Sequence, residues 1–408
     1  MTMRATDLFL LLLPAAPDSP SGCAGAAAPL RVLIAGGGTG GHLFPGIAVA
    51  QAFQERCPQT KVLFVSRGND FERTALERAG FPLATIAIEG FKGRGLWNQL
   101  RVLTGLPWAL AQSAGVLWRF RPDLVVGLGS YSAGPVALAA WAARIPVVLC
   151  EQNTLPGITN RLLARLADRI FTSFERTAGG FDPQKVVWTG NPLRREILTA
   201  GRAQKSNAGP FTVLVLGGSQ GAHRLNTAMV EALRRIPGLE RFAFIHQTGA
   251  TDESEVAAAY QAAGATACVQ AFFHDMADRY RAADLVVCRA GASTVAEITA
   301  LGKAAVYVPF PFAADDHQRL NAEQMVAAGA AESIAEAGLT GEVLAERILY
   351  YVARPELLGQ MEAESARLGK PDAAACIVDE CCRLVAGRGR THRSADKRAN
   401  GQTGEPCT

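Results

Sequence analysis

Residues 31–42 read RVLIAGGGTGGH, an apolar run followed directly by a glycine-rich turn. A helical pattern comes next, in which Ile47, Ala50 and Phe53 share one face. Small residues after a buried strand let backbone N–H groups approach an anion at the start of a helix. This stretch therefore predicts a strand, a glycine turn and a helix, the opening unit of a doubly wound α/β domain.

The same plan restarts in the second half of the chain. Residues 211–216 form an apolar run, residues 217–221 (GGSQG) a glycine turn, and a helical pattern begins at Leu225. We expect further strands in both halves, at 61–65, 124–127, 147–149, 242–246, 285–288 and 304–308. Strands that alternate with helical segments indicate a parallel sheet with helices on both faces.

Two Rossmann-like domains facing across a cleft are the predicted architecture. The first domain is expected at 30–199 and the second at 209–370, joined by the polar, glycine-containing segment 200–210. Residues 371–386 are apolar at helical spacing, and we expect this helix to pack back on the first domain. Ligands of such sheets bind beyond the carboxyl ends of the strands, which is where both glycine turns lie.

Composition narrows the classes of function. The chain has 408 residues, of which 49% are hydrophobic, enough for two cores. A net charge of +4 is too small to indicate nucleic acid, so no nucleic-acid partner is expected. The nine cysteines are scattered and include no pair with zinc-site spacing, which favours reduced thiols in a cytoplasmic protein.

Both ends of the chain differ from the rest. The apolar run 8–13 resembles a signal peptide but is short for one, so we expect residues 1–29 to be a disordered extension or to follow a start site placed too far upstream. The basic, apolar-poor tail 387–408 is expected to be disordered. No other stretch approaches about 18 uninterrupted apolar residues, so any membrane contact should be peripheral.

The first glycine turn, residues 36–41, admits several interpretations. It satisfies the G-x-G-x-x-G pattern, but the second expected strand is followed by Arg67 instead of an acidic residue. An enzyme that uses NADP, with Arg67 on the 2′-phosphate, stays an alternative, and so does a tight turn without a ligand. His42 opens the following helix, where it is a candidate general base or a structural histidine.

The second half carries its own candidate ligand groups. Ser219 and the neighbouring amides of the second glycine turn, residues 217–221, suit a diphosphate. Glu297 is expected one turn into a helix that follows the strand 285–288, where its carboxylate accepts hydrogen bonds from ribose hydroxyls or offsets the helix dipole. The loop 315–321 holds two aspartates and His317, but sugar recognition by Gln318 and Asn321 is a better use of it than a metal site.

Cations alternate with tryptophan and leucine in residues 91–108. This pattern suits an anionic membrane surface, or else an ordinary surface helix with an apolar buried side. The residues expected at the membrane are Lys92, Arg94, Trp97, Arg101 and Trp108.

Seven segments, taken in order, resemble the MurG family of glycosyltransferases: 36–42 (GGGTGGH), 129–135 (GSYSAGP), 151–153 (EQN), 190–194 (GNPLR), 217–222 (GGSQGA), 288–297 (CRAGASTVAE) and 316–318 (DHQ) with Asn321-Ala322. The resemblance runs from about Arg31 to about Val385. It implies a GT-B fold with the sugar donor in the second domain. The implied reaction is inverting transfer of N-acetylglucosamine from UDP-N-acetylglucosamine to the 4-hydroxyl of undecaprenyl-diphospho-muramoylpentapeptide, at the cytoplasmic face of the bacterial inner membrane.

The resemblance also implies a role for individual residues. Ser219 meets the diphosphate, Glu297 the ribose, and the backbone of Phe273 the uracil. Gln318 and Asn321 read the sugar hydroxyls, and His42 is the candidate base. The remaining expected contacts of UDP-N-acetylglucosamine are Ala292, Ser293 and Thr294 beside the nucleotide, and Thr39, Gly40, Gly41, Asn153 and Arg194 across the cleft.

No cofactor and no metal are expected. No Asp-x-Asp follows a strand, so helix dipoles and Arg194 would take the role that a divalent ion fills elsewhere. The chain departs from the family pattern at Cys150, where histidine is frequent, and at His223, where arginine is frequent. These departures leave local details of the acceptor and phosphate contacts open.

Three other functions compete with this one. A glycosyltransferase of the same fold that acts on diacylglycerol shares the glycine turns, although segments 151–153 and 316–318 favour the MurG family. An oxidoreductase that uses NADP would bind NADPH. A nonenzymatic sensor would bind UDP-N-acetylglucosamine without releasing UDP when acceptor is present.

Overall fold

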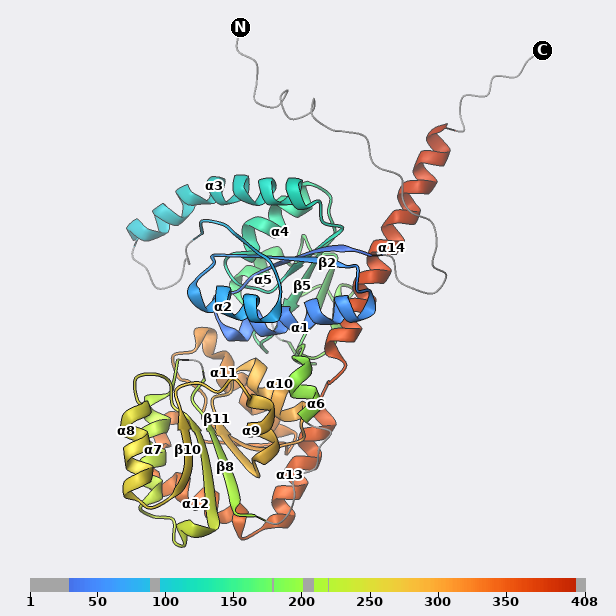
Figure 1. The fold of residues 1–408 in the computed structure, drawn as a ribbon. Coiled ribbons are helices and arrows are strands. Elements are labelled where there is room, and N and C mark those ends of the chain that lie inside the picture. Colours follow the sequence, from blue (N-terminus) through green and yellow to red (C-terminus); the bar gives the residue numbers. More distant parts are fainter. Residues whose placement is uncertain (1–28, 89–95, 178–179, 201–208, 219, 401–408) are drawn as a thin grey trace, which may run out of the picture.

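The computed structural model describes residues 29–88, 96–177, 180–200, 209–218 and 220–400 (Figure 1). For 96–104 and 389–400 it describes the backbone alone. The expected extension 1–29 therefore lies almost wholly outside the described residues, as does most of the expected linker 200–210.

The first domain is a seven-stranded parallel sheet in the order β3-β2-β1-β4-β5-β6-β7. Its strands are β1 (Arg31–Ala35), β2 (Lys61–Ser66), β3 (Leu83–Thr85), β4 (Leu124–Gly127), β5 (Val147–Glu151), β6 (Arg169–Thr172) and β7 (Val186–Trp188). Its helices are α1 (Gly40–Arg56), α2 (Asp70–Ala79), α3 (Leu96–Phe120), α4 (Ala133–Ala142) and α5 (Ile158–Leu163). The central strands β1, β4 and β5 are apolar except for a charged residue at one end of β1 and of β5, as expected of strands that helices cover on both faces.

The second domain repeats this topology with six parallel strands in the order β10-β9-β8-β11-β12-β13. Its strands are β8 (Phe211–Leu216), β9 (Phe242–Gln247), β10 (Thr266–Gln270), β11 (Leu285–Cys288), β12 (Ala304–Tyr307) and β13 (Glu332–Ser333). Its helices are α7 (His223–Leu233), α8 (Glu253–Ala262), α9 (Met276–Ala282), α10 (Ala292–Ala300), α11 (His317–Ala327), α12 (Gly341–Val352) and α13 (Pro355–Leu368). In both sheets the strand order reverses beside the strand that precedes a glycine turn, which places the turns at the switch points.

The predicted doubly wound α/β class is confirmed, and every strand expected from the sequence is present. Strands β3, β6, β7, β10 and β13 were not expected. Four of these, β3, β7, β10 and β13, lie at a sheet edge and are only partly buried, so they lack the continuous apolar run that marks a central strand.

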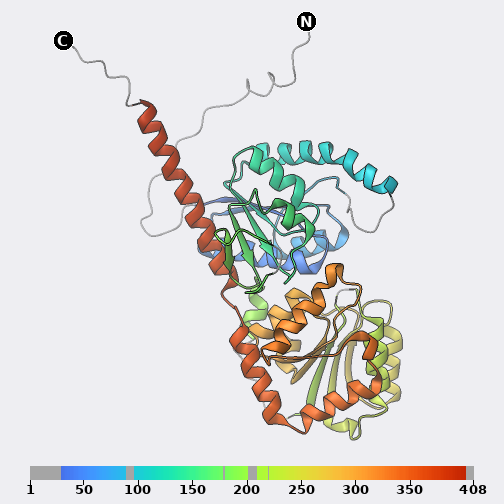
Figure 2. The ribbon, with the colours of Figure 1, turned by 180° about the vertical axis from the view of Figure 1, so that it is seen from behind.

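Two helices cross between the domains and shift the expected boundaries. Helix α6 (Arg195–Ala200) packs against α9, with Ile197 in the core of the second domain, so the first domain ends before α6 instead of at residue 199. Helix α14 (Ala373–Asn400) returns to the first domain (Figures 1 and 2), where Ile377, Val378 and Cys381 are buried in its core.

Helix α14 also continues to Asn400, whereas the tail from residue 387 was expected to be disordered. This part of the chain has almost no large apolar residues, which is typical of disorder. Its alanine, arginine and lysine residues are nevertheless good helix formers. A helix that is already nucleated by packing on the first domain extends readily through such residues.

Candidate active site

The two glycine turns face the same cleft. Its volume is about 870 Å³, and residues of both turns line it, Gly38, Thr39 and Gly40 from the first and Gln220 from the second. Arg194 and Phe273 also line this cleft. Ligand-sized space therefore lies beyond the carboxyl ends of β1 and β8, as the fold requires.

The first glycine turn leaves only some of its amides free. Gly36 adopts φ +136°, and a Cβ there would lie 2.8 Å from Leu128 Cβ, so only glycine fits. The Gly37 N–H donates to Ser130 Oγ (3.0 Å) and the Gly38 N–H to the buried Glu72 carboxylate (2.5 Å). The N–H groups of residues 39–41, at the start of α1, have no acceptor within the described part of the chain. These three amides are the donors that remain for an anion.

His42 stands just behind these amides. Its side chain is half-buried, and its Nδ1 lies 3.3 Å from Thr39 Oγ1. Burial, together with the nearby His317 of the second domain, lowers the pKa of His42 to about 4. The imidazole is therefore neutral at pH 7 and able to accept a proton.

The second glycine turn is tied to the loop that follows β10. Ser219 lies outside the described residues. Gln247 connects the two segments, since its Nε2 donates to Gly218 O (3.1 Å) and its Oε1 accepts from the Phe273 N–H (3.1 Å). The N–H of Phe273 is therefore already used, and its carbonyl has no donor within the described part of the chain. Gln247 was missed in the sequence because a glutamine at a strand end carries no distinctive signal.

Glu297 of α10 lies beside Arg194, which lines the cleft. Its Oε2 accepts a hydrogen bond from the hydroxyl of Tyr280 (2.8 Å), and its Oε1 lies 3.8 Å from Arg194 NH2. Burial raises the pKa of Glu297, while Arg194 and the Tyr280 hydroxyl act against that rise. The carboxylate is thus fixed from two sides.

The starts of α1 and α10 meet across the cleft. Ser293 Oγ lies 3.3 Å from Gly41 O, and Asn191 Nδ2 lies 3.5 Å from Ser293 Oγ. Neither helix has a side chain that caps its first turn. Ala292 is buried at the first position of α10, and Thr294 is half-buried two positions further on. The positive ends of two helix dipoles thus converge, an arrangement that favours an anion.

Asn321 lies at the junction of the two domains. It is fully buried, its Oδ1 accepts from the Thr154 N–H (3.1 Å), and its Nδ2 donates to Ala290 O (3.1 Å) and approaches Asn153 Oδ1 (3.5 Å). The side-chain amide of Asn321 therefore joins the two domains, which leaves it little capacity for a sugar hydroxyl. Gln318 accepts from the Phe310 N–H (3.0 Å), and its amide NH₂ has no acceptor among the described residues.

Asn153 lies in a loop that a carboxylate organises. Buried Glu151 accepts hydrogen bonds from the N–H groups of Asn153 (2.9 Å) and Gly157 (3.1 Å) and from Asn160 Nδ2 (2.8 Å). Burial raises the pKa of Glu151, and these donors oppose the rise. The segment 151–153 thus positions Asn153 beside Asn321 at the domain junction.

The expected membrane residues are only partly described. Lys92 and Arg94 lie outside the described residues, and Trp97 and Arg101 fall where α3 is described by its backbone. Trp108 of α3 is 64% exposed. None of the helices that the structure describes is long and apolar enough to cross a membrane. Within the same residues, no group of three or more His, Cys, Asp or Glu side chains has a metal-binding arrangement.

Comparison with protein families gives two matches. The glycosyltransferase family 28 N-terminal domain matches residues 32–172, and the glycosyltransferase family 28 C-terminal domain matches residues 212–377. The first match runs from β1 to β6 and the second from β8 into α14, so each includes one sheet's glycine turn.

Individual proteins agree with the family matches. A UDP-N-acetylglucosamine--N-acetylmuramyl-(pentapeptide) pyrophosphoryl-undecaprenol N-acetylglucosamine transferase of Anaeromyxobacter dehalogenans is 48% identical over 360 residues, 88% of this chain and 94% of the relative. The transferase of the same name from Myxococcus xanthus is 43% identical and covers 91% of this chain and 98% of the relative. The crystal structure of Acinetobacter baumannii MurG is 31% identical with a TM-score of 0.69, covering 86% of this chain and 98% of that one.

A more distant structure shares the fold alone. The UDP-GlcNAc 2-epimerase of Neisseria meningitidis, solved with UDP-GlcNAc bound, has a TM-score of 0.61 at 16% identity and covers 87% of this chain and 99% of that one.

Proposed function

This chain belongs to the MurG family within glycosyltransferase family 28, and from that membership we propose how its cleft carries out the family's reaction. It transfers N-acetylglucosamine from UDP-N-acetylglucosamine to the 4-hydroxyl of the lipid-linked muramyl-pentapeptide, a step of peptidoglycan synthesis. The fold is GT-B. The NADP alternative has no support, because both family matches are glycosyltransferase domains and both include a glycine turn.

One observation carries the proposed site. A carboxylate that is only 13% exposed, Glu297, lies one turn behind the start of α10, and the start of α1 lies opposite. A carboxylate accepts hydrogen bonds from ribose hydroxyls, whereas the helix starts favour the diphosphate. The UDP part of the donor therefore lies with its ribose on Glu297, its uracil at the backbone of Phe273, and its diphosphate near Ser219 and the amides of Ser293 and Thr294.

The reaction itself is a displacement at the anomeric carbon. The acceptor's 4-hydroxyl attacks this carbon, the bond to the UDP oxygen breaks, and the configuration inverts. His42 is the proposed base, since it is neutral at pH 7 and lies behind the free amides of the first turn. The negative charge that develops on UDP is stabilised by the helix starts and by Arg194.

The sugar hydroxyls are read by Gln318, whose NH₂ group is still available as a donor. Asn321 holds the two domains together beside this position and keeps Asn153 in place. We therefore assign Asn321 an indirect role in place of the direct contact that the resemblance implies.

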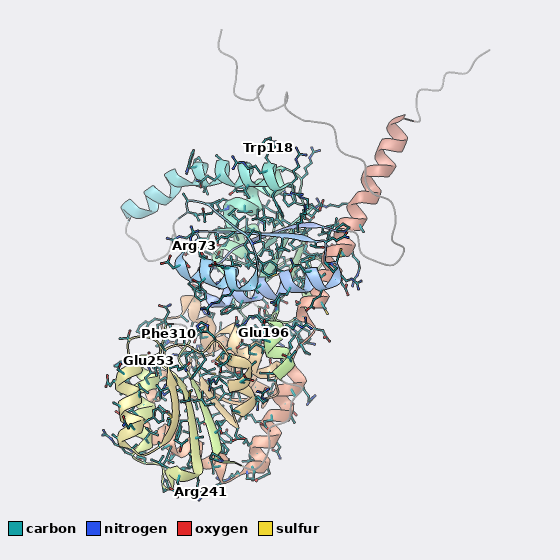
Figure 3. The ribbon with its side chains drawn as sticks, in the orientation of Figure 1. Arg73, Trp118, Glu196, Arg241, Glu253 and Phe310 are labelled. Atoms are coloured by element: carbon teal, nitrogen blue, oxygen red, sulfur yellow. The ribbon has the colours of Figure 1, made fainter. Side chains whose placement is uncertain are left out.

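An exposed aromatic face on the first domain suits the membrane that carries the acceptor. Trp108 and Trp118 of α3 are 64% and 54% exposed, and Trp141 of the adjacent α4 is 51% exposed. Trp118 lies on the outer side of the first domain, away from the second (Figure 3). Exposed tryptophans favour the interface of a bilayer. The proposed location is the cytoplasmic face of the bacterial inner membrane, held peripherally.

The test is release of UDP from UDP-N-acetylglucosamine with a lipid-linked muramyl-pentapeptide acceptor. The wild-type protein should release UDP only when acceptor is present, and Glu297→Ala should reduce kcat/KM by about 100-fold or more because a charged hydrogen-bond partner of the ribose is lost. Glu255→Ala, which removes an exposed carboxylate from α8, is the matched control and should behave as wild type. Folded protein that binds UDP but releases none with any muramyl lipid would indicate a glycolipid transferase of the same fold.

A further inference from the structure

We infer that Tyr280 is a positioning residue for the donor nucleotide, because it holds the carboxylate of Glu297 in the orientation that receives the ribose. This inference rests on the proposed role of Glu297. Tyr280 belongs to α9 and has no exposed surface. Its hydroxyl donates a hydrogen bond to Glu297 Oε2 (2.8 Å).

The two oxygens of Glu297 have partners of different kinds. Tyr280 is anchored inside the second domain, where its ring is packed in the core together with Phe273 and Tyr307. Arg194 comes from the segment that crosses between the domains, and its guanidinium lies over the ring of Phe44 in the first domain (4.2 Å). Arg194 also lines the cleft, and its Nε is buried without a hydrogen-bond partner within the described residues.

These differences determine which partner stays when the nucleotide binds. At 3.8 Å the Arg194 nitrogen is beyond hydrogen-bond distance of Oε1, so ribose hydroxyls can replace it at modest cost. The guanidinium, whose Nε is already unpaired among the described residues, is then released toward the phosphates. Tyr280 has no such freedom, because a rigid aromatic ring in a packed core keeps its position. Tyr280 is therefore the fixed partner that remains on Glu297 in the complex.

The hydrogen bond from Tyr280 to the Glu297 carboxylate has two effects. The hydrogen bond fixes the plane of the carboxylate, so both ribose hydroxyls meet correctly placed lone pairs. It also stabilises the ionised form of Glu297, which burial of most of its surface disfavours. The titratable groups that face Glu297 within the described residues are the Tyr280 hydroxyl from α9, Arg194 from the crossing segment, and the Cys288 thiol from β11. Of these, only Tyr280 both donates to the carboxylate and belongs to the second-domain core.

The test compares UDP with 2′,3′-dideoxy-UDP, which lacks both ribose hydroxyls. Dissociation constants are measured by titration calorimetry for the full-length wild type, Tyr280→Phe, Glu297→Gln and the double variant. Tyr280→Phe should weaken UDP binding about 5- to 20-fold, because a hydrogen bond to a charged group is lost. Its affinity for the dideoxy nucleotide should change by less than about twofold. With UDP-N-acetylglucosamine as substrate, the variant should raise KM while kcat stays within about twofold.

Tyr260→Phe is the matched control. Tyr260 is equally buried in the second domain, and its hydroxyl is hydrogen-bonded to His246 (3.2 Å) and not to Glu297. This variant should lose thermal stability comparably to Tyr280→Phe but bind UDP as wild type does. A comparable thermal loss in both variants separates a positioning effect from general damage to the core.

The outcomes distinguish this inference from the proposed function. If Glu297→Gln weakens UDP binding but Tyr280→Phe does not, the ribose assignment stands and the role of Tyr280 is refuted. The role of Tyr280 is also refuted if Tyr280→Phe weakens the binding of both nucleotides equally. If wild type binds both nucleotides alike and Glu297→Gln has no effect, the ribose assignment itself fails. A double variant no weaker than Glu297→Gln alone would show that Tyr280 acts through Glu297.

Discussion

Polar groups around the cleft fall into two classes. Some hold loops or domains in place through hydrogen bonds within the protein, and others remain for a ligand. Glu72 and Glu151 use their carboxylates to hold the backbone of nearby loops, and Asn321 uses its amide to join the domains. The amides at the start of α1 instead have no acceptor among the described residues, and the imidazole of His42 contacts Thr39 through Nδ1 and lies near His317. Groups without a partner in the protein are those left to bind or transform a substrate.

Replacement of His42 tests its proposed role as the general base. His42→Ala should reduce kcat about 100-fold or more, because general-base catalysis typically contributes a factor of that size. The dissociation constant for UDP should remain within about twofold of the wild-type value, since the His42 side chain is not among the proposed nucleotide contacts. Steady-state kinetics and a UDP titration measure both quantities. Near-normal turnover would remove His42 from the mechanism and point to another acceptor of the proton.

Helices α3 and α4 each have a buried side and also carry exposed tryptophans. They pack against each other and bury one side, with Ala109, Leu117 and Val136 in the interior. Trp108, Trp118 and Trp141 remain on the surface of this pair. An ordinary surface helix exposes charged residues on its outer side, so exposed tryptophans on two adjacent helices indicate an apolar partner.

Binding to vesicles tests this helix pair. The double variant Trp108→Ser and Trp118→Ser should bind anionic phospholipid vesicles at least about tenfold more weakly, because each tryptophan loses apolar area that the bilayer would bury. UDP binding should not change. Phe312→Ser removes a residue that is 83% exposed on the second domain and serves as the control. The fraction of protein that sediments with the vesicles measures binding. If the tryptophan double variant and Phe312→Ser lose vesicle binding equally, α3 and α4 do not form a specific membrane-binding surface.

The molecule as a whole consists of two domains that touch largely through polar contacts and are joined by two crossing segments. The segments meet where Gly190, at φ +87°, passes so close to Lys370 that a Cβ would lie 2.3 Å from the Cβ of that lysine. Polar domain interfaces of this kind permit relative motion. Arg194, Asn191 and Asn321 all lie at this junction, so domain position and site geometry are linked.

Each domain also holds a histidine whose pKa is lowered in the folded state. Burial lowers the pKa of His42 to about 4 and that of His246 to about 3. In the unfolded chain both have a pKa near 6.5, so below that pH the unfolded state binds more protons than the folded one. The free energy of unfolding should therefore fall as the pH decreases from about 6.5 to 4, by up to about 1.4 kcal/mol per pH unit for each histidine.

Urea unfolding at about pH 7.5, 6 and 5 measures this dependence. His42→Asn should show a shallower decrease than wild type, because one of the two groups no longer titrates. A variant with the same pH slope as wild type would show that His42 is protonated equally in the folded and unfolded states.

Much of this protein followed from local sequence patterns. The central strands were predictable from continuous apolar runs, since only a strand buried on both faces has that composition. Both glycine turns, the start of α10 and the position of Glu297 were predictable as well, because each depends on residues adjacent in the chain. The order of seven short segments was enough to indicate the family and its reaction.

Other features depend on residues that meet only after folding. Tyr280 and Glu297 are 17 positions apart, Gln247 and Phe273 are 26, and Asn321 reaches Thr154 across 167 positions. The side-chain amide of Asn321 bonds between the domains, and α6 packs on the second domain although it follows the first. The sugar contact expected of Asn321 stays a prediction. Periodicity and turn residues report the environment of a segment along the chain, whereas hydrogen-bond partners and domain contacts depend on distances that the packed core sets.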